Sequence, residues 1–143
     1  MRKLFAIFAA VAMCLAGPSA TSKQPTVHVI HRDGGGVLFH YIEKYYVWNT
    51  NGDRVRVAGE CYSACTLVLG ALDNRRICAA RGAQFGFHSA SNSGEFTQGG
   101  TEFMWSFYSG QVREVLARHG WAAPSYHPEF LMINAQEIVR PCE

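Results

Sequence analysis

Two residues of this sequence carry the chemistry of an activated nucleophile. Ser63 lies in the segment 59–65 (GECYSAC), and His88 follows 25 residues later at the end of the segment 85–88 (FGFH). A serine hydroxyl becomes an effective nucleophile when a neighbouring imidazole removes its proton during attack on a carbonyl carbon. The pair therefore predicts nucleophilic catalysis, provided that the fold brings the hydroxyl and the imidazole together.

Strand-like segments lead into both residues. Residues 54–58 (RVRVA) precede the serine motif, and residues 83–87 (AQFGF) precede His88. In an open sheet flanked by helices, side chains at the carboxyl ends of the strands converge on one crevice. We therefore expect Ser63 and His88 to meet at one edge of a sheet.

The rest of the chain predicts the elements that hold this edge in place. Strands are expected at residues 26–31 and 77–80, helices at 37–48, 64–72, 101–119 (capped by Thr101) and, shorter, at 135–139, and a polar loop at 89–100. This order of strands and helices predicts a single-domain α/β fold built in layers.

Attack by Ser63 also requires donors for the developing oxyanion. Ala64 would begin the helix after the serine, where free backbone amides favour negative charge. Gly35 or Gly36, in the glycine-rich turn after the first strand, would supply the second amide. Simpler structural roles remain open, with Ser63 as a helix cap and His88 as a core histidine bonded to a backbone carbonyl.

The first twenty residues have the pattern of a secretory signal. Arg2 and Lys3 precede the apolar run 4–15, and small residues at 17–20 end it, so we place cleavage after Ala20. Cleavage after residue 16 or 17 and a lipoprotein signal at Cys14 are the alternatives. The mature domain would then comprise residues 21–143, exported to the periplasm or secreted, with no stable membrane anchor.

Charge argues against nucleic acid as a partner. Cleavage removes two of the 13 Lys and Arg residues, so that the remaining bases equal the 11 Asp and Glu residues. A neutral chain gives no electrostatic reason to bind a phosphate backbone. The sequence also has no phosphate-binding lysine motif of the GxxxxGK[ST] type, and we expect no cofactor.

Four cysteines remain after cleavage, and in an exported chain they predict two disulfides. Three pairings are open, of which we favour Cys65–Cys78 with Cys61–Cys142, the latter pinning the C-terminal segment. The alternative is a zinc site of cysteines with His88. A second metal hypothesis, at residues 28, 31 and 40, is weaker, because histidines three apart on a strand point to opposite faces.

The serine and histidine motifs together resemble a known family. GECYSAC, then an apolar helix, then RRICAA and GAQFGFH are similar to the proteolytic subunit of Clp-type serine proteases. The similarity is greater to its small exported relatives, which share GxCxSACT, a further cysteine and FGFH. The resemblance runs from about Thr26 to the C-terminus and implies a ClpP/crotonase-like fold of stacked β-β-α units. It also implies Ser63 as nucleophile, His88 as general base and Gly35 and Ala64 as oxyanion donors.

The third catalytic residue is where the chain departs from the family. The proteases carry an aspartate after the long helix, whereas this region reads HPEF at 127–130, so that Glu129 is the nearest acid. The first functional hypothesis is an exported, peptidase-like serine hydrolase acting on peptides or small acyl compounds. The alternative is an inactive scaffold of the same fold that binds a peptide or a partner protein. The family also implies assembly into a homo-oligomer.

Overall fold

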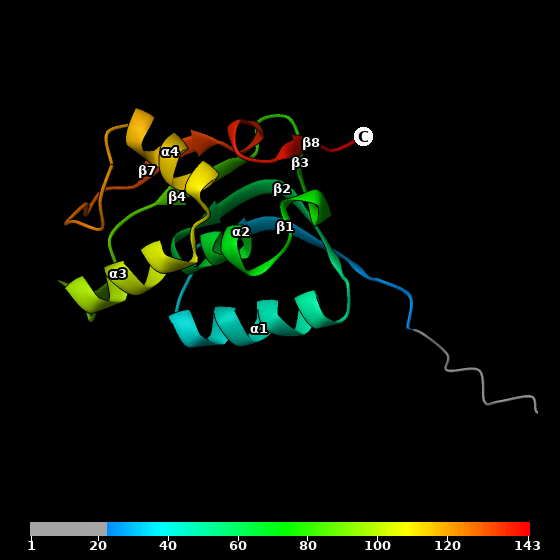
Figure 1. Ribbon diagram of the computed structural model, residues 1–143, viewed down its shortest axis with the longest axis horizontal. Helices are drawn as coiled ribbons and strands as arrows, with labels where there is room; N and C mark the ends of the chain where they lie inside the picture. Colours follow the sequence, from blue (N-terminus) through cyan, green and yellow to red (C-terminus); the bar gives the residue numbers. More distant parts are fainter. Residues whose placement is uncertain (1–22) are drawn as a thin grey trace, which may run out of the picture.

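Strands and helices alternate along residues 23–143, which the computed structural model describes (Figure 1). The predicted signal segment lies outside the described residues. The strands are β1 (Val27–Asp33), β2 (Arg54–Tyr62), β3 (Ile77–Ala79), β4 (Gln84–Phe87), β5 (Ser91–Asn92), β6 (Glu95–Phe96), β7 (Leu131–Asn134) and β8 (Arg140–Pro141). The helices are α1 (Leu38–Thr50), α2 (Val68–Ala71), α3 (Gln98–Phe107) and α4 (Gly110–Arg118), with 3₁₀ turns η1 (Ser63–Leu67), η2 (Asn74–Arg76) and η3 (Ala135–Glu137).

The main sheet is organised around β2. β1 runs parallel to β2 along one edge, while β3 and then β4 run parallel to it along the other edge. β8 extends the sheet parallel to β3, and β7 adds an antiparallel strand beside β4. β5 and β6 form a separate two-stranded hairpin. The prediction of an α/β fold is therefore confirmed.

A glycine allows β1 and β2 to approach closely near the middle of β2. The register between the two strands shifts between Ile30 and Arg32. A Cβ atom at Gly59 would lie 2.1 Å from the carbonyl oxygen of His31, so a side chain cannot be placed there. The irregularity falls between the part of β2 that pairs with β3 and the part that pairs with β4. Bulges of this kind bend a strand, and this one precedes the turn that carries Ser63.

Burial alternates along β2 and identifies the covered face of the sheet. Val55 and Val57 are buried, whereas Arg54 and Arg56 are exposed. Figure 1 shows α2 and α1 stacked on one side of β1 and β2, and α4 next to β7. Tyr45, on the inner face of α1, is completely buried in the core. No helix among residues 23–143 is both long and apolar enough to cross a membrane.

The predicted long helix at 101–119 is two helices, and the prediction of one is wrong. α3 ends at Phe107, and Ser109 then caps α4 by accepting a hydrogen bond from the Val112 N–H. Thr101 is not a cap, since it lies inside α3 and is buried. The apolar stripe of the sequence continues across the break and therefore concealed it. Similarly, the predicted loop at 89–100 contains the β5–β6 hairpin and the first turn of α3.

Two disulfides are present, but with a different pairing from the one we favoured. The bonds join Cys61 to Cys65 and Cys78 to Cys142. Cys61 lies near the end of β2 and Cys65 in η1, which brings their Cα atoms within 5.3 Å. Cys142 follows β8 beside β3, where its N–H donates to the Ala79 carbonyl, so its sulfur meets Cys78. With all four thiols oxidised, the cysteine zinc site is excluded.

Candidate active site

Ser63 occupies a sharp turn between the central strand and a helix. It is the first residue of η1, directly after β2, and its φ of +54° lies in the left-handed region. A residue other than glycine is seldom found there, and such conformations concentrate at functional sites. The Ser63 carbonyl accepts a hydrogen bond of 2.6 Å from the Thr66 hydroxyl, which secures the turn. A serine on a strand–turn–helix corner is presented clear of the backbone, as a nucleophile must be.

The glycine-rich turn after β1 packs directly against this corner. A Cβ atom at Gly35 would lie 2.6 Å from the Ser63 Cβ, 2.7 Å from the Tyr62 carbonyl oxygen and 2.9 Å from the Ala64 nitrogen. Gly35 also has a φ of +84°, which glycine alone adopts readily. The fold thus brings together the two residues predicted as oxyanion donors, Gly35 and Ala64.

The Gly35 amide, however, already has an acceptor. Its N–H donates to Asp33 Oδ1 at 3.0 Å, and the Tyr41 hydroxyl donates to the same oxygen. Lys44 lies 3.5 Å from the other oxygen of this carboxylate. Burial, together with the bond to Asp33, raises the pKa of Tyr41 well above its usual value. Asp33 therefore clamps the turn, and the next residue, Gly36, lines the cavity together with Ser63.

His88 follows β4, at the same edge of the sheet as Ser63. Tyr62 at the end of β2 pairs with Gly86 of β4, so the segments that follow the two strands leave the sheet side by side. The His88 ring is partly buried, with its centroid 4.5 Å from that of Phe130. Its Nε2 is buried and has no hydrogen-bond partner among residues 23–143. Burial lowers the pKa of the imidazole, and the charge of His127 lowers it further. A lowered pKa suits a general base, but no hydrogen bond joins His88 to Ser63 among residues 23–143.

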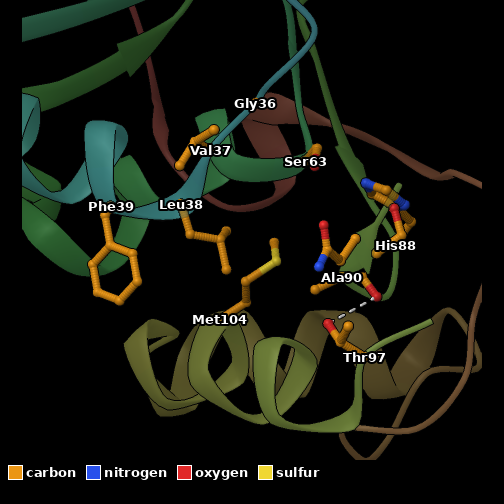
Figure 2. A pocket seen from close by; sticks show the side chains of 11 residues that line it. Gly36, Val37, Leu38, Phe39, Ser63, His88, Ala90, Thr97 and Met104 are labelled. Atoms are coloured by element: carbon orange, nitrogen blue, oxygen red, sulfur yellow. Dashed lines mark hydrogen bonds between the residues drawn. The ribbon is translucent and has the colours of Figure 1, made fainter. Parts of the chain in front are cut away.

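Ser63 and His88 line the same cavity, which has a volume of about 630 Å³. Figure 2 shows them at one end of it, with Phe39 toward the other end and Met104 between. The remaining lining residues come from the start of α1, the β4–β5 segment and the start of α3: Gly36, Val37, Leu38, Ala90, Ser91, Asn92 and Thr97. None of them carries a fixed charge, so the cavity suits a neutral ligand with an apolar portion.

The expected third residue, Glu129, does not reach His88. Within residues 23–143 no hydrogen bond or ion pair joins a carboxylate to His88, and Glu129 is exposed. The segment around it is held by its neighbours. His127 exchanges hydrogen bonds with Ser89, the Nδ1 of His127 bonds the Glu129 carbonyl, and the Phe130 ring packs on His88. These contacts do not involve the Glu129 carboxylate, which faces solvent.

The sequence did not reveal several residues that build the site. Asp33 was visible only as part of a glycine-rich turn, although an acid directly before three glycines is a signal for a clamped turn. Phe130 and His127 lie in a segment without periodicity, so nothing in the sequence indicated their contacts with the histidine loop. Cys61 and Cys65, on either side of Ser63, were recognised as cysteines but not as a pair around the serine.

The other histidines do not assemble into a metal site. The Nε2 of His28 lies 2.8 Å from Asp53 Oδ2, while His31 and His40 are exposed. The described residues contain no group of three or more His, Cys, Asp or Glu side chains placed to hold a metal ion. The His28–Asp53 pair instead joins β1 to the turn before β2.

Comparisons with known proteins add no identification. No family model matches the chain, and neither a curated protein nor a solved structure matches it. The geometry of the cavity at the carboxyl ends of β2 and β4 is therefore the basis for a functional assignment.

Proposed function

We propose that the chain is an exported, peptidase-like serine hydrolase with a ClpP/crotonase-like fold. The observation that carries the proposal is the placement of Ser63, in a left-handed strand–helix turn, on one cavity with a partly buried, neutral His88. The two disulfides support a location in an oxidising compartment such as the periplasm. The parallel arrangement of β1 to β4 supports the fold.

The proposed reaction follows from the groups on the cavity wall. Ser63 Oγ attacks the substrate carbonyl carbon while His88 takes the hydroxyl proton. The amides of Ala64 and Gly36 receive the oxyanion, with the Gly36 turn held in place by Asp33. His88 then passes its proton to the leaving amine or alcohol, and water hydrolyses the acyl-enzyme by the reverse sequence of proton transfers. The substrate is a peptide or a small acyl compound whose acyl part is apolar, because the cavity has an apolar far end.

A fluorophosphonate probe tests the proposal, because it reacts covalently with an activated serine. We expect the mature protein to be labelled and both Ser63→Ala and His88→Ala to be unlabelled. Ser106→Ala, which removes an exposed hydroxyl on α3, is the matched control and should label as the parent does. Circular dichroism of every variant confirms that it is folded. Labelling that persists in Ser63→Ala, or a folded parent that is not labelled, would contradict the proposal.

The second candidate function is a scaffold that binds a peptide or a partner protein. It is favoured by one observation, the lack of a carboxylate on His88 among the described residues. In serine hydrolases the loss of the orienting acid lowers kcat about 10⁴-fold. The scaffold would be favoured if the folded parent is not labelled by the probe but binds a peptide in the cavity.

A further inference from the structure

A second cavity is also lined by His88. Its volume is about 320 Å³, and it shares His88, Ala90 and Ser91 with the first cavity. The rest of its wall is largely aromatic or small, and comprises Ser89, Gly94, Phe96, Tyr126, Pro128 and Phe130. Among the described residues, no aspartate, glutamate, lysine or arginine lines this cavity. The two cavities thus meet at the residue that moves the proton in the proposed reaction.

The direction of proton transfer decides which part of a substrate lies in each cavity. This step rests on the proposed function. The acyl carbon must lie at Ser63 with its oxygen at the Gly36 and Ala64 amides, which places the acyl part in the first cavity. The bond from that carbon to the leaving nitrogen or oxygen breaks as His88 gives up the proton taken from Ser63. The leaving group must therefore contact His88, on the side away from the acyl part.

We propose that the second cavity binds the leaving group of the substrate and that this group is an uncharged aromatic amine or alcohol. In a peptide, this corresponds to an aromatic residue on the carboxyl side of the cleaved bond.

The aromatic lining of the second cavity favours an aromatic leaving group. The rings of Phe96 and Tyr126 meet edge to face with centroids 5.2 Å apart, and Phe130 lies against both His88 and Tyr62. Rings arranged in this way present faces and edges to a further ring. A cationic group would also be attracted to aromatic faces, but it would find no carboxylate on this wall.

Three acetate esters with a common acyl part test the leaving-group cavity. Benzyl acetate carries an aromatic alcohol, ethyl acetate a small aliphatic one, and acetylcholine a cationic one. We expect kcat/KM to be highest for benzyl acetate. Tyr126→Ala and Phe96→Ala should each lower the benzyl-to-ethyl ratio about three- to tenfold, the range expected for one aromatic contact. Circular dichroism should show that both variants are folded as the parent is.

Tyr46→Ala is the matched control, since Tyr46 is exposed on α1 and lines neither cavity. It should leave the ratio unchanged. A labelled, active parent without a benzyl preference, or with a ratio that Tyr126→Ala and Phe96→Ala do not alter, would overturn the inference and leave the hydrolase standing. A higher kcat/KM for acetylcholine than for benzyl acetate would contradict the proposal that the leaving group is uncharged.

A binding measurement separates this inference from the proposed reaction. Benzyl alcohol is titrated into the Ser63→Ala protein and followed by the NMR shifts of the Phe96, Tyr126 and Phe130 rings. We expect saturable shifts at these rings and none at Tyr46. Shifts confined to the first cavity would overturn the aromatic site even in an active enzyme. An unlabelled, inactive parent would instead overturn the hydrolase and, with it, the leaving-group role.

Discussion

The structure contains two histidines in opposite circumstances. His28, on β1, bonds the buried carboxylate of Asp53 and stacks on Trp48 with ring centroids 3.8 Å apart. His88 has no carboxylate partner within residues 23–143, and its Nε2 is buried without a hydrogen bond. Yet His88, not His28, shares a cavity with a serine.

The comparison teaches that a histidine–carboxylate pair is no sign of catalysis by itself. Asp53 also accepts the Thr26 N–H, so the pair ties the start of β1 to the turn before β2 and satisfies its own groups. A satisfied buried pair holds a fold together. The His88 Nε2, by contrast, is unsatisfied among residues 23–143, and a buried polar atom without a partner is unusual in a folded protein.

Substitution of His88 should have the largest effect on fluorophosphonate labelling, and substitution of His28 should have almost none. His88→Ala should reduce the rate of fluorophosphonate labelling at least about 10³-fold, because the base is lost. His28→Ala should change that rate less than about twofold, because His28 lines neither cavity. Labelling rates of the folded variants measure both. Comparable losses at the two positions would show that the His88 effect is structural.

Removal of the Cys61–Cys65 disulfide, which encloses Ser63, should have the next largest effect on the labelling rate. Replacing Cys61 and Cys65 together by alanine should lower the labelling rate about tenfold, because the left-handed turn is no longer held closed. The loss of unfolding free energy should be roughly 2 kcal/mol, since the loop is short.

Replacing Cys78 and Cys142 is the matched control for the disulfide around Ser63. This bond closes a loop with a sequence separation of 64, so its loss should cost roughly 4 kcal/mol of unfolding free energy. The folded fraction should still label at the parent's rate. Urea unfolding and labelling, measured on the same samples, separate stability from geometry. Equal labelling rates for the two double variants would contradict a role of the Cys61–Cys65 disulfide in holding the turn at Ser63.

The labelling rate should depend on pH through the protonation of His88. Burial lowers the pKa of His88, so the neutral base should persist below pH 6.5, the ordinary pKa of histidine. The labelling rate should therefore fall only below that pH. Phe130→Ala exposes the ring and should move the decline to higher pH, with a several-fold lower rate near pH 6. A pH profile that this substitution does not shift would contradict burial by Phe130 as the cause.

Loss of the His28–Asp53 pair should have a small effect, and on thermal stability alone. The hydrogen bonds from His28 and from the Thr26 N–H lower the pKa of Asp53 in the folded protein. A lowered carboxyl pKa stabilises the fold above its ordinary value, near 3.9, and this contribution is lost as the pH falls further. Asp53→Asn should lower Tm by a few degrees at pH 7 and should lack the decline below pH 4. Thermal unfolding between pH 3 and 7 checks both, with the labelling rate at pH 7 unchanged.

The sequence predicted the parts of the site that obey a local rule. Ser63 and His88 were placed correctly at one edge of the sheet because each follows a strand and parallel strands end together. The disulfide pairing required the order of the strands, which local pattern does not contain. Glu129 was expected because it is the nearest acid in the region where the resembling proteases carry an aspartate, but in an irregular segment the direction of a side chain depends on tertiary contacts.

The fold was predicted least well where elements are short or end within an apolar stripe. β7 and β8 span four and two residues, too few for a periodic signal, and both depend on pairing with β4 and β3. The break between α3 and α4 was missed because hydrophobic periodicity continues across it. Ser109 and Gly110 were the local signals that could have revealed it.

The contact between Gly35 and the serine corner has a consequence for recognising relatives of this chain. Two of the three atoms that a Cβ at Gly35 would strike belong to the backbone, at Tyr62 and Ala64. Replacing the serine leaves those atoms in place, so the glycine stays necessary after the hydroxyl has gone. In an alignment, Gly35 should therefore mark descent from the same fold, and Ser63 with His88 should mark the members that retain the reaction.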